Sequence, residues 1–109
     1  MTTDDAIDAL LQQKLQIEEQ LPALLGACQT DAERATVKGA YQRAVDQWNT
    51  AVTKSLVADQ NSLRTLVGQL GDIREQIQSA IKQADDLGSI LNRIVGGIAV
   101  GSKIVMALR

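Results

Sequence analysis

A heptad repeat of apolar residues constrains this chain more than any other feature of its sequence. The repeat begins at Leu63 and continues to Leu108. An apolar spacing of about 3.5 residues, kept over about six heptads, is typical of a helix that buries a seam against another helix. One set of seam positions is Leu63, Leu70, Ile77, Ala84, Leu91, Ile98 and Val105, and the interleaved set is Leu66, Ile73, Ala80, Leu87, Ile94, Gly101 and Leu108. The repeat predicts a helical architecture and says little about chemistry.

The composition agrees with one helical domain over residues 1–109. The chain has 109 residues, of which 45% are hydrophobic, and it carries a formal net charge of −2. Phe is absent, and Tyr41 and Trp48 are the only aromatic residues. A core of Leu, Ile, Val and Ala suits closely packed helices, and the charge and hydrophobicity are those of a folded rather than a disordered chain. The length allows a single core.

The first predicted helix covers residues 4–26. Thr3 is a suitable N-cap, and Asp4 and Asp5 follow it in the first turn, where negative charge is favourable. Pro22 lies inside the apolar pattern and removes one backbone hydrogen bond, so we expect a kink or break near residues 17–20. Gly26 is the expected stop.

Two further helices are predicted, over residues 31–58 and 62–108. The second begins at a capping box formed by Thr30 and Glu33. A polar segment at residues 58–62 predicts a turn, although one helix from 31 to about 85 would also fit. The third helix could break near residues 85–89, where Gly88 offers a stop and Ser89 a cap. The seam keeps its phase across that segment, which favours continuity or at most a kink.

These elements predict an all-α protein: an antiparallel bundle of three long helices, or of four shorter ones, with coiled-coil character. The repeat of residues 62–108 has more apolar surface than the thinner second helix can cover. We therefore expect either a homo-oligomer or a protein partner, and the function expected is that of a non-enzymatic interaction module, such as an assembly subunit, adaptor or small inhibitor.

Enzymatic chemistry has little support in the sequence. The chain has no His and a single cysteine, Cys28. This excludes Ser-His and Cys-His nucleophiles, His-rich metal sites and an intrachain disulfide. We expect Cys28 to be a small buried hydrophobic residue. Adjacent acids such as Glu18 and Glu19 point about 100 degrees apart on a helix and do not converge on one site. We predict no catalytic residues, no metal site and no cofactor.

Charge argues against nucleic-acid binding and separates the two ends of the chain. The 11 basic residues are spread evenly, and the isoelectric point is near 4.9, so we predict no nucleic-acid partner. Acids dominate residues 1–33, whereas residues 87–109 hold Arg93, Lys103 and Arg109 and no acid. This asymmetry favours packing the first helix beside the last, in this chain or in a neighbouring one. Alternatively, the charges only complement the helix dipoles.

The C-terminal segment, residues 88–109, carries the predicted interface. Gly97 and Gly101 have the four-residue spacing that lets two helices approach closely. Trp48 and Tyr41 share a helix face and are secondary anchors. The predicted interface residues are Leu91, Ile94, Gly97, Ile98, Gly101, Val105, Tyr41 and Trp48.

The same segment supports an alternative function at a membrane. From Ile94 to Leu108 it is apolar, although these 15 residues are fewer than the roughly 20 of a comfortable transmembrane span. Its apolar face, three bases and lack of acids are typical of an amphipathic anchor or a membrane-active helix. The third interpretation is a strongly buried helix of the core.

The start of the chain bears on where the protein is expected. The N-terminus is acidic and lacks an apolar run, so we predict no secretory signal peptide. We expect a cytoplasmic protein; export by a signal-free route and a location at the membrane surface are the alternatives.

Overall fold

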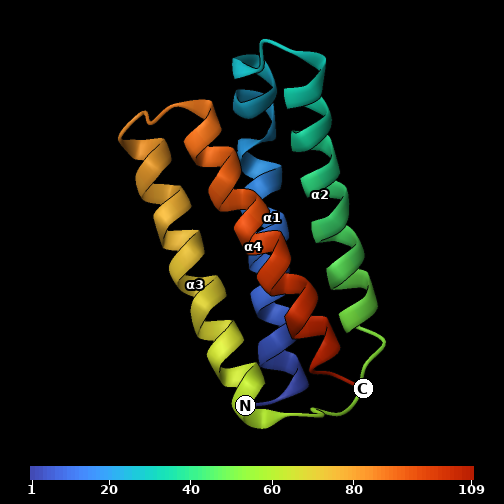
Figure 1. Ribbon diagram of the computed structural model, residues 1–109. Coiled ribbons are helices and arrows are strands. Elements are labelled where there is room, and N and C mark those ends of the chain that lie inside the picture. Colours follow the sequence, from blue (N-terminus) through green and yellow to red (C-terminus); the bar gives the residue numbers. More distant parts are fainter.

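The computed structural model describes residues 1–109, which form four α-helices (Figure 1). The helices are α1 (Thr3–Ala27), α2 (Asp31–Ala51), α3 (Gln60–Lys82) and α4 (Leu87–Met106). The all-α class predicted from the sequence is confirmed.

The heptad repeat is divided between α3 and α4 rather than carried by one helix over residues 62–108. α3 ends at Lys82, and Ala84 then adopts a φ of 56°, in the left-handed region that non-glycine residues rarely occupy. The Asp86 side chain begins α4 by accepting a hydrogen bond of 2.7 Å from the Ser89 amide. Gly88 and Ser89, the expected stop and cap, both lie inside α4. The apolar residues of α3 and α4 therefore follow one continuous heptad count, although the chain reverses direction between the two helices.

The α2 helix ends seven residues before the predicted boundary at residue 58, at Ala51. Residues 55–58 instead pair with the C-terminal residues through backbone hydrogen bonds. The amides of Ser55 and Leu56 both donate to the Arg109 oxygen, at 2.8 and 2.9 Å, and the Ala58 amide donates to the Ala107 oxygen at 2.8 Å. Val57 and Leu108 form an isolated antiparallel β-bridge between these segments. This pairing satisfies backbone groups that a longer helix would have satisfied internally.

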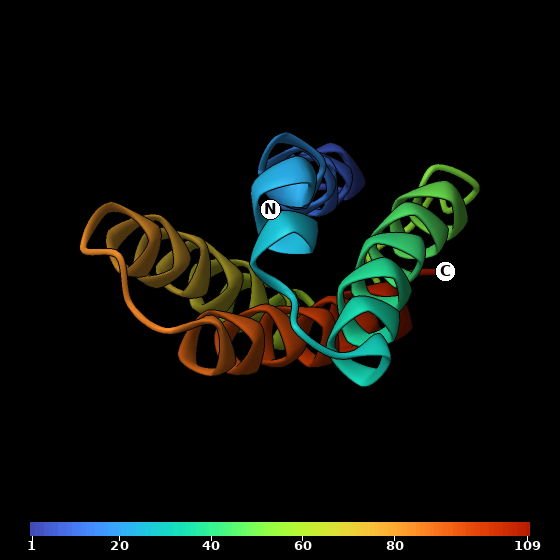
Figure 2. The same cartoon turned by 90° about the horizontal axis from the view of Figure 1, so that it is seen from above.

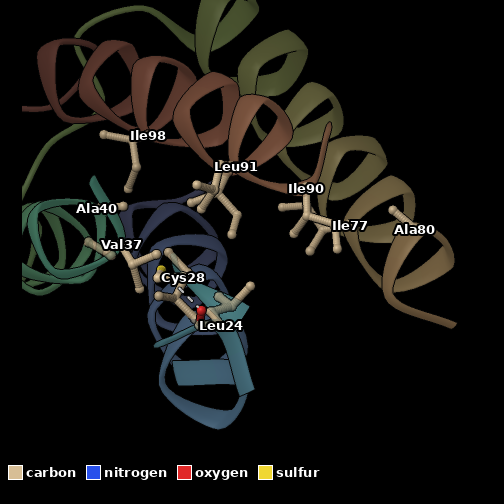
Figure 3. Close-up of a cluster of buried hydrophobic side chains, with 12 residues drawn as sticks. Leu24, Cys28, Val37, Ala40, Ile77, Ala80, Ile90, Leu91 and Ile98 are labelled. Carbon is tan, nitrogen blue, oxygen red and sulfur yellow. Dashed lines mark hydrogen bonds between the residues drawn. The ribbon is translucent and has the colours of Figure 1, made fainter. Parts of the chain in front are cut away.

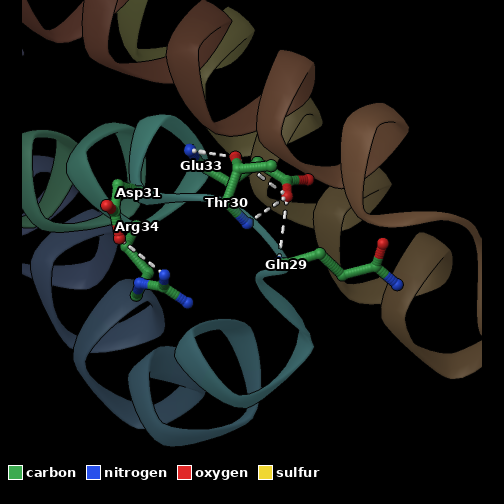
Figure 4. A network of polar contacts seen from close by, with 5 residues as sticks. All are labelled: Gln29, Thr30, Asp31, Glu33 and Arg34. Carbon is green, nitrogen blue, oxygen red and sulfur yellow. Dashed lines mark hydrogen bonds and ion pairs between the residues drawn. The ribbon is translucent and has the colours of Figure 1, made fainter.

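The starts of α1 and α2 are both fixed by capping boxes. In α1 the cap is Thr2 rather than Thr3, because the Asp5 amide donates to Thr2 Oγ1 and the Asp5 carboxylate accepts from the Thr2 amide. Figure 4 shows the predicted box of α2, where the Glu33 carboxylate accepts hydrogen bonds from the amides of Gln29 and Thr30 at 3.0 and 3.1 Å. The α1 helix continues through Pro22 to Ala27 without a break.

The four helices alternate in direction, and both chain termini lie at the same end of the molecule (Figure 1). α1 and α4 each pack against the other three helices, whereas α2 and α3 do not pack against each other. Figure 2 shows the consequence: α3, α4 and α2 form a curved layer, and α1 lies over its concave side. One face of α4 is therefore covered by the rest of the chain, and the opposite face lies on the convex side of the layer.

The interior consists of two clusters of buried aliphatic residues, one toward each end of the helices. Figure 3 shows the larger cluster, to which α4 contributes Ile90, Leu91 and Ile98. The second cluster is built around Leu10, Leu63 and Ile104, which are fully buried. Cys28 is buried in the first cluster, as predicted, and its thiol lies 3.2 Å from the Leu24 oxygen.

Candidate functional site

Most of the predicted interface residues lie inside the chain. Figure 3 shows Leu91 and Ile98 directed from α4 toward the side chains of α1 and α2. Val105 is half-buried, as are Tyr41 and Trp48 on α2. The buried members of the predicted set are Leu91, Ile94, Gly97, Ile98 and Gly101. These five residues are therefore not available to a partner of the folded monomer, and the existence of an interface remains a prediction.

The two aromatic residues hold α2 against α1. The Tyr41 hydroxyl donates a hydrogen bond of 2.9 Å to the Glu18 carboxylate, and this bond raises the pKa of Tyr41 above its usual value. Lys14 places its ammonium 5.5 Å from the centroid of the Trp48 ring, within the range of a cation–π interaction. Lys14 also pairs with Glu18 at 3.7 Å. Both aromatic side chains are thus already engaged within the chain.

A buried polar layer separates the two aliphatic clusters. Gln13 of α1 and Gln47 of α2 are 3% and 8% exposed, and the Gln13 amide group donates to Gln47 Oε1 at 2.9 Å. Gln47 Nε2 donates to the Ile98 oxygen at 2.8 Å and to Ser102 Oγ at 3.0 Å. This layer joins α1, α2 and α4 through hydrogen bonds at the centre of the molecule.

The spaced glycines of α4 make room for this polar layer. A β-carbon at Gly101 would overlap Oε1 of Gln47 and lie 2.9 Å from its Cδ. A β-carbon at Gly97 would lie 3.1 Å from Oε1 of Gln13. The space beside these two glycines, whose spacing predicted a close approach of another helix, is therefore filled by two glutamine side chains of the same chain.

The exposed face of α4 carries a second heptad-spaced row, which we call the outer stripe. Its members follow one another at intervals of four and three residues, all are exposed, and none is charged. Met106 is 81% exposed and Val95 is 45% exposed. The outer stripe consists of Gly88, Asn92, Val95, Ala99, Ser102 and Met106.

The outer faces of the other helices differ from this stripe because they are charged. α1 exposes several carboxylates, and α2 and α3 expose residues of both signs. Examples are Asp4, Asp8 and Glu19 on α1, Lys38, Arg43 and Asp46 on α2, and Arg64, Asp72 and Glu75 on α3. An uncharged row as long as a helix is therefore confined to α4.

Two hollows border the outer stripe. On the side of α2, a hollow of about 270 Å³ is lined by Ala35, Gly39 and Val95 among others. On the side of α3, an open hollow of about 640 Å³ is lined by Thr65, Lys103 and Met106 among others. Both give side chains of a neighbouring molecule room beside the stripe.

The stripe was not recognised in the sequence because its side chains are small. Gly, Ala and Ser contribute little to a hydrophobic pattern, whereas the aliphatic residues of the inward face dominate it. The signal that could have revealed the stripe is the absence of charge at six positions with heptad spacing. Opposite-face positions of a long helix in water usually carry charges.

The packing of α1 beside α4 does not depend on ion pairs between them. The chain has two salt bridges, Lys14 with Glu18 and Arg34 with Asp31, and each lies within one helix. Asp5 instead serves its own helix: the hydrogen bonds from Thr2 hold the pKa of Asp5 below its usual value. The acids at the start of α1 therefore support the interpretation based on helix dipoles and caps.

Comparison with known proteins gives no relative: no family model, no curated protein and no solved structure matches the chain. The structure brings together no group of three or more acidic, Cys or His side chains that could hold a metal ion.

Proposed function

We propose that the protein is a non-enzymatic interaction module that docks the outer stripe of α4 on a protein surface. The observation that carries this proposal is the contrast between the uncharged stripe and the charged outer faces of the other helices. Burying an uncharged surface with exposed side chains such as Val95 and Met106 in an interface lowers the free energy. Burying exposed charges raises it.

The small side chains of the stripe also support helix-to-helix docking. Gly, Ala and Ser at heptad positions let a second helix approach closely and gain contact along its length. The hollows beside Val95 and Met106 can then receive larger side chains from the docked surface.

We also propose that the four helices form an antiparallel bundle with coiled-coil character. In its support, the seam residues Leu63, Leu70 and Ile77 of α3 and Leu91 and Ile98 of α4 are all buried. Such a bundle would be a rigid platform for the stripe, because α4 packs against all three other helices.

Site-specific photo-crosslinking tests the interaction function. Benzoylphenylalanine replaces Val95 in the stripe or, as a matched control, the exposed Gln78 of α3, in the cells that produce the protein. We expect a discrete adduct from position 95, with the crosslinked peptide identified by mass spectrometry, and none from position 78. Equal labelling from both positions, or no adduct at position 95, would contradict the proposal.

A second candidate function is membrane association through α4. The observation in its favour is that α4, with 20 residues, is long and apolar enough to cross a membrane, a test that core helices of soluble proteins also pass. We prefer docking on a protein, since the most apolar face of α4 is covered by α1, α2 and α3. Flotation of the full chain with anionic vesicles separates the two roles: recovery with the vesicles that resists high salt would favour the membrane.

A further inference from the structure

We propose that the surface bound by the outer stripe is the same stripe of a second copy of this chain, with the two α4 helices antiparallel. This inference rests on the docking function proposed above and specifies its partner. It follows from the order of residues along the stripe, from the charges at the two ends of α4 and from the exposure of the stripe over the whole helix.

The order of residues makes the stripe complementary to itself in the antiparallel direction. Its intervals of four, three, four, three and four residues read the same from either end. With the two centres aligned, Gly88 of one copy faces Met106 of the second copy, and Val95 faces Ala99. The largest side chain of the stripe therefore meets a residue with no side chain, and a medium-sized residue meets a small one. Such pairing fills space evenly along the contact.

The polar members of the stripe also meet in this register. Asn92 of one copy faces Ser102 of the second copy. Ser102 Oγ already accepts a hydrogen bond from Gln47 Nε2, so its hydroxyl proton remains to be donated to the Asn92 amide oxygen. Each facing pair of Asn92 and Ser102 can therefore form one hydrogen bond inside the contact.

Charge favours the antiparallel direction over the parallel one. α4 has Asp85 and Asp86 before its first residue and the exposed Lys103 in its last turn. In the antiparallel pair, Lys103 of each copy lies in the N-terminal half of the other α4, level with Leu91 and about 7.5 Å along the axis from Asp86 of the second copy. In a parallel pair the two lysines would lie together, and Met106 would be crowded against Met106. Antiparallel helix dipoles add to the preference.

The pair has the symmetry expected of a homodimer. The register places a twofold axis at the middle of α4, level with residue 97 and between Val95 and Ala99 on the stripe. The stripe is about 27 Å long and its side chains are small, so the contact falls in the class of small interfaces. We therefore expect dissociation on the order of micromolar concentrations.

Sedimentation equilibrium over a concentration series measures the association. We expect the 11.7 kDa chain to associate to twice its mass with rising concentration. Ala99→Glu, which puts two carboxylates into the central layers, is expected to weaken association at least tenfold. The control Gln78→Glu adds the same charge to the exposed face of α3 and is expected to leave association unchanged. A wild-type chain that stays monomeric to millimolar concentration overturns the inference, as does association to which Ala99→Glu makes no difference.

Disulfide trapping tests the register directly and does not depend on a weakened variant. In a Cys28→Ala background, Gly88→Cys and Met106→Cys are prepared separately and oxidised alone or mixed. The antiparallel register predicts a crosslink in the mixture and little from Met106→Cys alone, because the two copies of residue 106 lie about 27 Å apart along the axis. Ready crosslinking of Met106→Cys with itself, and none in the mixture, overturns the register.

Failure of this inference can be separated from failure of the docking function. A photo-adduct between position 95 and a different protein, together with a monomeric wild-type chain, would overturn the homodimer and leave the docking function standing. Absence of any adduct from position 95 would count against both.

Discussion

The two faces of α4 have the same heptad spacing and opposite contents. The inward face alternates large aliphatic residues such as Ile94 and Ile104 with two glycines, and the chain itself fills the space beside those glycines. The outward face carries the uncharged outer stripe and, beside it, the exposed Lys103, and no other helix of the monomer covers it (Figure 2). A heptad repeat therefore indicates where a helix can pack against another. The size of the side chains then indicates which of the two faces packs inside the monomer.

The largest effect expected from this comparison is on stability, when one aliphatic side chain is truncated on each face. Ile104 is 0% exposed in the core, and Ile104→Ala should lower the free energy of unfolding by about 2–5 kcal/mol. Met106→Ala, two residues away on the outward face, should change it by less than about 0.5 kcal/mol. Urea titrations at low protein concentration, where the chain is monomeric, measure both. Similar losses from the two substitutions would contradict the assignment of the faces.

Glycine-to-alanine substitutions provide the next test. They raise helix propensity at every position, but they destabilise the fold where the added β-carbon would clash with a neighbour. Gly101→Ala adds a β-carbon that displaces the Gln47 side chain from its buried hydrogen bonds, and should destabilise the chain by about 1–3 kcal/mol. Gly96→Ala has open space around its β-carbon and should stabilise the monomer by up to about 1 kcal/mol.

A double variant identifies the cause of the Gly101 effect. Gln47→Ala removes the side chain that the new β-carbon would strike, so Gly101→Ala should cost less in the Gln47→Ala background than in the wild type. An additive double variant would mean that Gln47 is not what the β-carbon meets.

A smaller effect is expected at the turn that sets the direction of α4. Ala84 has a φ of 56°, which glycine adopts without the clash of a β-carbon. Ala84→Gly should therefore raise the free energy of unfolding by roughly 0.5–1 kcal/mol, measured by thermal or urea unfolding. The exposed Gly68→Ala on α3 is a useful reference for propensity alone, because its β-carbon would meet nothing. A loss of stability in Ala84→Gly would show that the turn is not under strain.

The smallest effect concerns pH and involves the capping carboxylates of α1 and α3. Hydrogen bonds from Thr2 and Ser62 hold the pKa values of Asp5 and Asp59 below their usual range. Because the folded chain favours the ionised carboxylates, their contribution is complete above the pKa of the unfolded chain, about 4. It is lost as the pH falls through the lower folded values. Asp59→Asn should flatten the loss of stability with acid below about pH 4, whereas Gln78→Glu should not; an unchanged acid profile in Asp59→Asn would contradict the assignment.

The all-α class was predictable because aliphatic spacing and caps act locally. The box of Thr30 and Glu33 forms as its sequence indicates, since its hydrogen bonds join residues three positions apart. The reversal after Lys82 was not predictable from the same signals, because it places Ala84 in a conformation that the sequence gives no reason to expect. The preserved seam phase pointed the other way, and phase alone does not distinguish one long helix from two antiparallel ones.

The interior of the first helix contains a residue that its apolar pattern does not indicate. Seven-residue steps from Ile7 to Leu21 and Cys28 pass through Lys14, whereas Gln13 is the buried residue and Lys14 lies beside the Trp48 ring. A polar residue enters a core when a partner on another helix satisfies it, and Gln47 is 34 positions away in the sequence. For a related reason the sequence did not reveal what packs against Gly97 and Gly101. Their neighbours are Gln13 and Gln47, and polar side chains of this kind are normally assigned to the surface.

The glutamine layer has a consequence for alternative alignments of the helices. Helices lined with Leu, Ile and Ala can slide past one another by a turn and still bury similar side chains, so such chains risk several nearly equivalent states. Here a one-turn slide of α1 along α2 would part Gln13 from Gln47 and leave the Gln13 NH2 group and Gln47 Oε1 buried without that hydrogen bond, whereas Gln47 Nε2 would keep its bonds to α4. Each group left buried without a partner would cost about 1–3 kcal/mol. One layer of hydrogen bonds therefore selects a single alignment of α1, α2 and α4, and with it the side of α4 that is left outside.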